Sequence, residues 1–64
     1  MGLKFYCGKK VNIVGTNGKS FVGTVSDYFF PDDNESEKES IVIDTYDGDA
    51  IEFTEEDIQT IAII

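Results

Sequence analysis

The side chains that offer chemistry in this sequence are carboxylates and aromatic rings rather than the usual catalytic groups. The 64 residues contain no histidine, and Cys7 is the only cysteine. A thiol needs a base whose pKa lies near neutrality to become a nucleophile, and the sequence offers no such base. The carboxylates show no pairing that would suit acid–base work. We therefore predict that the protein is not an enzyme and binds no cofactor.

An acidic segment opened by the only proline is the first candidate for binding. Residues 31–39 read PDDNESEKE, so Asp32, Asp33 and Glu35 lie close together in a polar stretch. A calcium loop of the EF-hand type needs glycine at its sixth position, where this segment has Glu37. We expect a flexible, solvated loop that holds no metal ion. The alternative is a loop that becomes ordered when it docks on a partner.

Three consecutive aromatic residues, Tyr28, Phe29 and Phe30, stand directly before the acidic segment. Neighbouring side chains of a strand point to opposite faces, so a strand cannot bury all three. Tyr46 is also expected to point outward. Exposed aromatic rings beside an acidic loop suit a protein segment with apolar and basic residues. The alternative is that Phe29 closes one end of the fold while Tyr28 and Phe30 lie under the loop. The candidate partner-binding residues are thus Tyr28, Phe29, Phe30, Tyr46, Asp32, Asp33 and Glu35.

Charge is distributed unevenly along the sequence. Residues 1–26 contain four lysines and no acid, whereas residues 27–64 contain thirteen acids and one lysine. Lys9, Lys10 and Lys19 are the candidates for a basic patch that binds nucleic acid, and such binding would weaken as salt rises. The net charge of −8 opposes a nucleic acid and favours a protein partner.

The acidic residues themselves leave two interpretations open. A large net charge keeps a small β-protein soluble. The same charge suits a mimic of nucleic acid that occupies a basic protein by electrostatic complementarity, as small acidic proteins of bacterial phage and mobile elements do.

Turn-forming residues divide the sequence into short segments rich in β-branched residues. Asn17-Gly18 and Asp47-Gly48 are hairpin signals of the type I′ class. Gly23, in the middle of the longest segment, marks a bend, a bulge or a close backbone approach. Alternation of apolar and polar residues between the turns indicates strands. The expected strands are Val11–Val14, Ser20–Phe30, Ile41–Tyr46, Ala50–Thr54 and Thr60–Ile64.

Five short antiparallel strands predict an all-β fold, a small barrel that spans residues 1–64 as a single domain. Closure into a barrel removes exposed sheet edges. Residues 54–57 carry a capping pattern and leave room for one 3₁₀ turn before the last strand. The apolar residues 61–64 either close the barrel against residues 11–14 or pair with another copy, so a homo-oligomer is open. The expected core is Val11, Ile13, Phe21, Val25, Ile41, Ile43, Ile51, Phe53, Ile58, Ile61 and Ile63.

Residues 8–13 read GKKVNI, and residues 18–25 follow with the pattern GxxFxGxV. Together these two segments resemble the opening of Sm-like and KOW-type barrels. Both families have an SH3-like fold with a strongly bent second strand, and residues 53–58 resemble the single turn before the last strand of such folds. The resemblance covers residues 8–64 and implies fold more than function. Sm-like proteins bind RNA, but residues 54–56 are Thr-Glu-Glu where the basic step of that family would stand, and the motif near residues 27–29 lacks its asparagine.

The sequence also bears on location. No apolar run approaches the ~18 residues needed to span a membrane. The first six residues contain no apolar signal core. A reducing cytoplasm is therefore the expected location, and Cys7 is expected to be a buried or half-buried small apolar residue.

Overall fold

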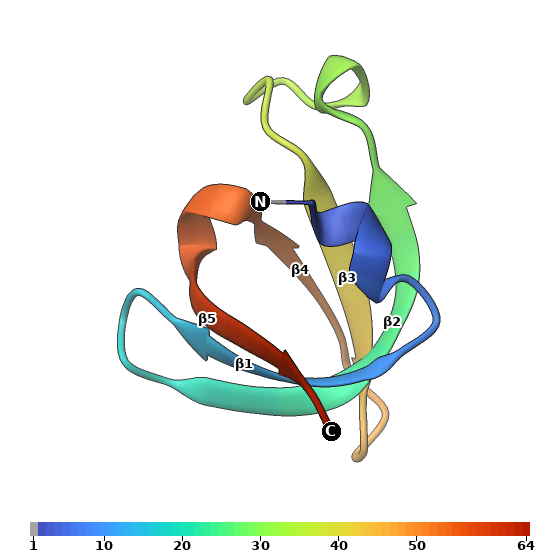
Figure 1. Ribbon diagram of the computed structural model, residues 1–64, viewed down its shortest axis with the longest axis vertical. Coiled ribbons are helices and arrows are strands. Elements are labelled where there is room, and N and C mark those ends of the chain that lie inside the picture. The colour runs from blue at the N-terminus through green and yellow to red at the C-terminus, as the bar shows by residue number, and fades with distance from the viewer. Residues whose placement is uncertain (1) are drawn as a thin grey trace.

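The computed structural model describes residues 2–64, and its strands form one open antiparallel sheet of five. The strand order is β4-β3-β2-β1-β5, so the first four strands follow one another as neighbours and the last returns to the far side of the first (Figure 1). The predicted all-β class and antiparallel pairing are confirmed. The strands are β1 (Lys10–Gly15), β2 (Ser20–Phe29), β3 (Ser40–Thr45), β4 (Ala50–Thr54) and β5 (Ile58–Ile63), with 3₁₀ turns η1 (Leu3–Tyr6), η2 (Pro31–Asp33) and η3 (Glu55–Asp57).

The longest strand, β2, belongs to both halves of the sheet. It pairs with β1 on one side and with β3 on the other, and the two pairings overlap at Gly23 and Thr24. A Cβ atom at Gly23 would lie 2.6 Å from the backbone oxygen of Asp44 on β3. The predicted close approach at Gly23 is therefore confirmed. Farther along, the register of β2 against β3 shifts between Val25 and Asp27, which leaves Ser26 as an extra, bulged residue.

Both tight hairpins form where they were predicted, but their turn type differs from the prediction. Gly18 and Gly48 adopt φ angles of +85° and +93°. A type I′ turn also needs positive φ at Asn17 and Asp47, yet Glu37 is the only non-glycine residue among residues 2–64 with that geometry. In each hairpin the glycine N–H donates to the carbonyl three residues earlier. Each loop is thus a type I turn followed by a left-handed glycine.

Most of the predicted core is confirmed. Phe21, Ile51 and Ile61 pack against the core while remaining partly exposed. Ile63 was predicted inside, but it is 47% exposed, because it ends the edge strand β5 and no strand lies beyond it. The buried residues are Leu3, Val11, Ile13, Val25, Ile41, Ile43, Phe53 and Ile58.

The segment before β1 contributes structure that the sequence patterns did not indicate. Leu3 is completely buried and joins the core from η1. Burial of one leucine side chain contributes roughly 1.5–3 kcal/mol, a large share of the stability of so small a domain. Cys7, which ends this turn, is exposed rather than buried, because the chain reverses there toward β1. None of the helices in residues 2–64 has the length and apolar character needed to cross a lipid bilayer.

The close approach at Gly23 yields the first testable prediction. Gly23→Ala should destabilise the fold by about 1–3 kcal/mol, because the added methyl group must displace the backbone of β3. Gly2→Ala is the matched control, since no atom lies within 4 Å of a Cβ built at that position. Urea unfolding of the two variants measures the difference, and equal stabilities would contradict the role assigned to Gly23.

Candidate interaction surface

Four aromatic side chains from two segments form two edge-to-face pairs. Phe5 and Tyr6 of η1 form an edge-to-face pair, with ring centroids 5.4 Å apart at 87°. Tyr28 and Phe30, at the end of β2 and just after it, form a second such pair at 5.1 Å and 84°. The turn η1 packs beside β2 and β3, as Figure 1 shows. We call Phe5, Tyr6, Tyr28 and Phe30 the aromatic cluster.

The bulge at Ser26 decides which of the three consecutive aromatic residues faces the core. Without an extra residue, strict alternation from Val25 would turn Phe29 inward. The bulge changes the phase by one residue, so Tyr28 packs against the core and Phe29 is 38% exposed. The alternative in which Phe29 closes one end of the fold is therefore wrong. Phe30, one residue beyond the strand, is 51% exposed.

The turn η1 is attached to the sheet at both of its ends. The backbone N–H of Leu3 donates to the carboxylate of Glu39 at 2.6 Å, a contact that spans 36 residues of chain. At the other end, Gly8 N–H donates to Val25 O at 2.9 Å, and Val25 N–H donates to Lys9 O at 3.0 Å. These bonds, together with the buried Leu3 side chain, hold the rings of η1 in place beside β2.

Two lysines lie over the exposed rings of the cluster. The Nζ atom of Lys4 is 5.2 Å from the ring centroid of Phe30, and that of Lys9 is 5.6 Å from the centroid of Phe5. Contacts of this kind at exposed sites contribute about 0.5–1 kcal/mol. Lys4 also links the two aromatic pairs, since it belongs to η1 and covers a ring that follows β2.

The predicted basic patch is divided by the fold. Lys9 and Lys10 lie at the start of β1, whereas Lys19 follows the turn at its other end. Val14 directly precedes that turn and lies four residues after Lys10. The strand between them rises by about 13 Å, so the two ends of β1 are at least that far apart. Lys19 therefore does not share a surface with Lys9, and the expectation of one patch is wrong.

The acidic segment 31–39 has internal hydrogen bonds. Asp32 and Asp33 form the exposed turn η2 directly after Phe30. The side-chain amide of Asn34 donates to the carbonyl of Lys38 at 2.7 Å and to the hydroxyl of Ser40 at 3.1 Å. Glu35, the residue after Asn34, is exposed. Asp32 and Asp33 thus stand next to the aromatic cluster.

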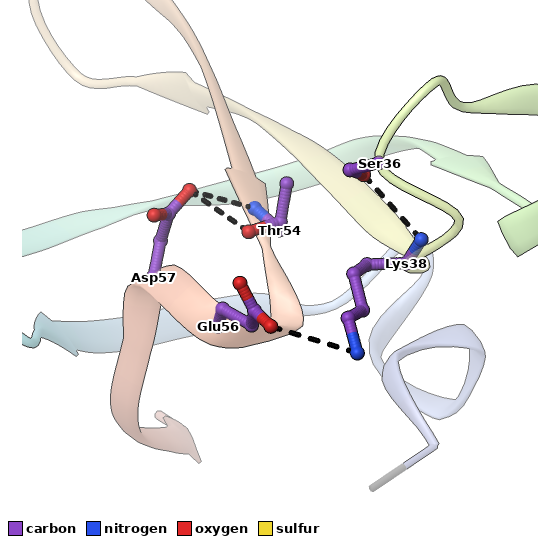
Figure 2. A network of polar contacts seen from close by, with 5 residues as sticks. All are labelled: Ser36, Lys38, Thr54, Glu56 and Asp57. Carbon is purple, nitrogen blue, oxygen red and sulfur yellow. Dashed lines mark hydrogen bonds and ion pairs between the residues drawn. The ribbon is translucent and has the colours of Figure 1, made fainter.

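The acidic segment also reaches the turn before β5. Lys38 pairs with Glu56 of η3 at 3.5 Å, as Figure 2 shows, and the two side chains are 42% and 70% exposed. In the same view the carboxylate of Asp57 accepts hydrogen bonds from the backbone N–H and the hydroxyl of Thr54, each at 3.1 Å. The predicted capping pattern is therefore confirmed. Lys38, the single cation among the acids, is engaged with one of them.

Tyr46 lies apart from the other candidate residues. It is fully exposed in the β3–β4 turn, while Phe29 pairs with Ser40 at the opposite end of β3. Six residues of strand separate Ser40 from Tyr46, a rise of about 20 Å. In the same turn, a hydrogen bond from the Thr45 hydroxyl lowers the pKa of Asp47. Tyr46 borders a separate hollow of about 430 Å³, lined by Lys10, Val22, Gly23, Thr24, Asp44, Thr45 and Tyr46.

The uneven distribution of charge along the sequence separates the folded molecule into an acidic part and a part that carries lysines but no acids. All thirteen acids fall in residues 27–57, which form the end of β2, β3, β4, η2 and η3. Residues 2–26 and 58–64 form η1, β1, the start of β2 and β5, and they contain four lysines and no acidic side chain. The aromatic cluster lies on the border, because η1 belongs to the basic part and Phe30 is followed by Asp32.

Comparison with protein-family models, curated proteins and solved structures gives no significant match. Within residues 2–64, no group of three or more acidic or cysteine side chains is arranged to hold a metal ion.

The environment of Tyr28 yields a prediction about pH. Partial burial of the ring raises the pKa of its phenol, and the negative charges of Glu39 and Glu55 raise it further. The neutral phenol is thus favoured in the folded state. We expect the stability from Tyr28 to be intact below the unfolded pKa of about 10 and lost as pH rises through the higher folded value.

Comparison of the parent protein with Tyr28→Phe tests this expectation. Unfolding by urea at a series of alkaline pH values should show a smaller loss of stability in the variant, since lysine titration is common to both proteins. Identical pH dependence in the two proteins would show that Tyr28 is not the group responsible.

Proposed function

We propose that this chain is a non-enzymatic binding module that takes up a segment of a partner protein on the aromatic cluster. The observation that carries the proposal is the exposure of Phe5 (66%) and Phe30 (51%) on two segments that are fixed to the fold. Aromatic rings are enriched in the buried centres of protein interfaces and often dominate the binding energy there. A partner that covers the rings removes their apolar surface from water.

Charge next to the rings indicates the chemistry of the partner segment. Asp32 and Asp33 follow Phe30 after a single proline, and Glu35 is exposed in the same loop. Apolar side chains of the partner would contact the rings, while lysine or arginine side chains would meet the loop. The partner that suits this surface is a segment with both apolar and basic residues.

For the fold, we propose an SH3-like or Sm-like small barrel. Support comes from the close approach of β2 to β3 at Gly23, the bulge at Ser26 and the single turn η3 between β4 and β5. We further propose that the module works in a reducing compartment such as the cytoplasm. The exposed Cys7 thiol would be liable to oxidation in an oxidising one.

A second candidate function, binding of single-stranded nucleic acid, is favoured by one observation. Lys4 and Lys9 lie on exposed aromatic rings, and single strands bind to surfaces that combine cationic groups with rings on which bases stack. The net charge of −8 opposes this function, because it repels a phosphate backbone at long range. A mimic of nucleic acid, the third candidate, would instead use the acidic part against a basic protein.

The protein-binding function makes a direct prediction. Phe5→Ser and Phe30→Ser should each weaken binding to peptides that combine apolar residues with lysine or arginine, by about tenfold for a hot-spot ring. Tyr46→Ser is the control, because Tyr46 is an even more exposed aromatic residue that lies at the far end of β3. Binding to an array of such peptides and of acidic counterparts provides the measurement. Equal losses in all three variants, or a preference for acidic peptides, would contradict the proposal.

The nucleic-acid function is tested with a single-stranded oligonucleotide. If it holds, the protein retains the oligonucleotide at low salt and releases it as salt rises. Lys4→Gln and Lys9→Gln should then abolish retention, while Lys19→Gln should leave it unchanged, because Lys19 lies away from the rings. Absence of retention at low salt would reject this candidate.

A further inference from the structure

The two edges of the sheet differ in how they are protected against pairing with another strand. Edge strands in natural proteins are usually guarded by charged side chains. The edge strand β4 contains Glu52 and is flanked by Asp49 and Glu55. The edge strand β5 contains no charge, and residues 58–64 read IQTIAII. In a chain of which 28% is charged, an uncharged edge is a feature to explain.

The backbone of β5 has groups available for a further strand. Ile64 N–H donates to Lys10 O at 3.0 Å, so the backbone groups of Ile64 and, by alternation, of Ala62 point toward β1. The N–H and C=O groups of Ile61 and Ile63 then point to the opposite side, where no strand of residues 2–64 pairs. Ile63 and Ile64 are also 47% and 61% exposed, so apolar side chains border these free groups.

We infer that β5 is an edge for self-association, where two copies of the chain pair their β5 strands in antiparallel orientation about a two-fold axis. A pairing centred on Ala62 places Ile61 of one copy opposite Ile63 of the second copy. Each of these residues then exchanges both of its free backbone groups in hydrogen bonds. Ala62 faces Ala62 of the second copy, and its small side chain allows the close approach that such a pair requires.

The distribution of charge indicates why the occupant is a second copy. Two chains of net charge −8 repel each other chiefly through their acidic parts, and contact at β5 keeps those parts apart, although it brings the lysine-bearing residues of the two copies closer together. β5 and its neighbour β1 lie in the part of residues 2–64 that has no acidic side chain. A two-fold axis through β5 therefore keeps the acidic parts of the two copies far apart. Because the remaining force is repulsive, salt should strengthen the dimer by screening it.

Sedimentation equilibrium across micromolar to millimolar protein, at low and high salt, tests the inference. We expect a monomer–dimer equilibrium whose dissociation constant falls as salt rises. Ala62→Lys should raise the dissociation constant about fivefold or more, because two lysines then face each other across the axis. Ala50→Lys is the matched control, since Ala50 is an exposed alanine of the other edge strand, β4.

A second variant guards against loss of folding. Ile63→Pro removes an N–H that the monomer does not use, so the variant should retain the circular dichroism of the fold and fail to dimerise. A protein that stays monomeric under all conditions overturns the inference, as does a dimer that weakens with salt. Equal effects of Ala62→Lys and Ala50→Lys also overturn it, because β5 would then contribute no more to the contact than β4 does. Peptide binding by the aromatic cluster is a separate readout, and its failure would not affect this result.

Discussion

The approach of β3 to β2 at Gly23 is the constraint on which the arrangement of the molecule depends. The backbone oxygen of Asp44 occupies space that any side chain at Gly23 would fill. β2 pairs with β1 up to Thr24 and with β3 from Gly23 onward. The approach at Gly23 therefore sets the direction of the second half of β2 relative to its first half. That second half ends in Tyr28 and Phe29, so the position of the aromatic cluster follows from a residue that has no side chain.

Two local features then convert the direction of β2 into a surface. The bulge at Ser26 turns Tyr28 toward the core and leaves Phe29 and Phe30 outside. The buried side chain of Leu3 brings η1 against the same part of the sheet, and with it Phe5. Each ring is thus exposed although the segment that carries it is fixed. A rigid, exposed ring loses little conformational entropy when a partner covers it, which is why such rings serve as anchors in interfaces.

Much of the fold follows from the sequence because strand alternation is a local signal. The inward positions of β1 and β3, such as Ile13 and Ile43, are readable from one segment alone. The bulge is not readable in this way, because a single extra residue reverses the faces of all residues after it and leaves no mark in composition. The role of Leu3 was missed for another reason. Its burial and its bond to Glu39 depend on a part of the chain 36 residues away, which no local pattern contains.

The division of charge shows how the fold changes the meaning of a sequence pattern. Along the chain, the uncharged residues 58–64 follow the acidic part and read as its tail. In space, β5 lies beside β1, so these residues join the lysine-bearing part instead. The molecule thereby acquires a strongly acidic part, a part without acidic side chains, and a border between them. The aromatic cluster occupies the border, whereas β5 lies in the part without acids. Recognition of a partner and association between copies would therefore use different surfaces, and salt would affect the two in opposite directions. Salt weakens the attraction between a basic partner segment and the acidic loop. It also weakens the repulsion between two copies that meet at β5, and so favours their association.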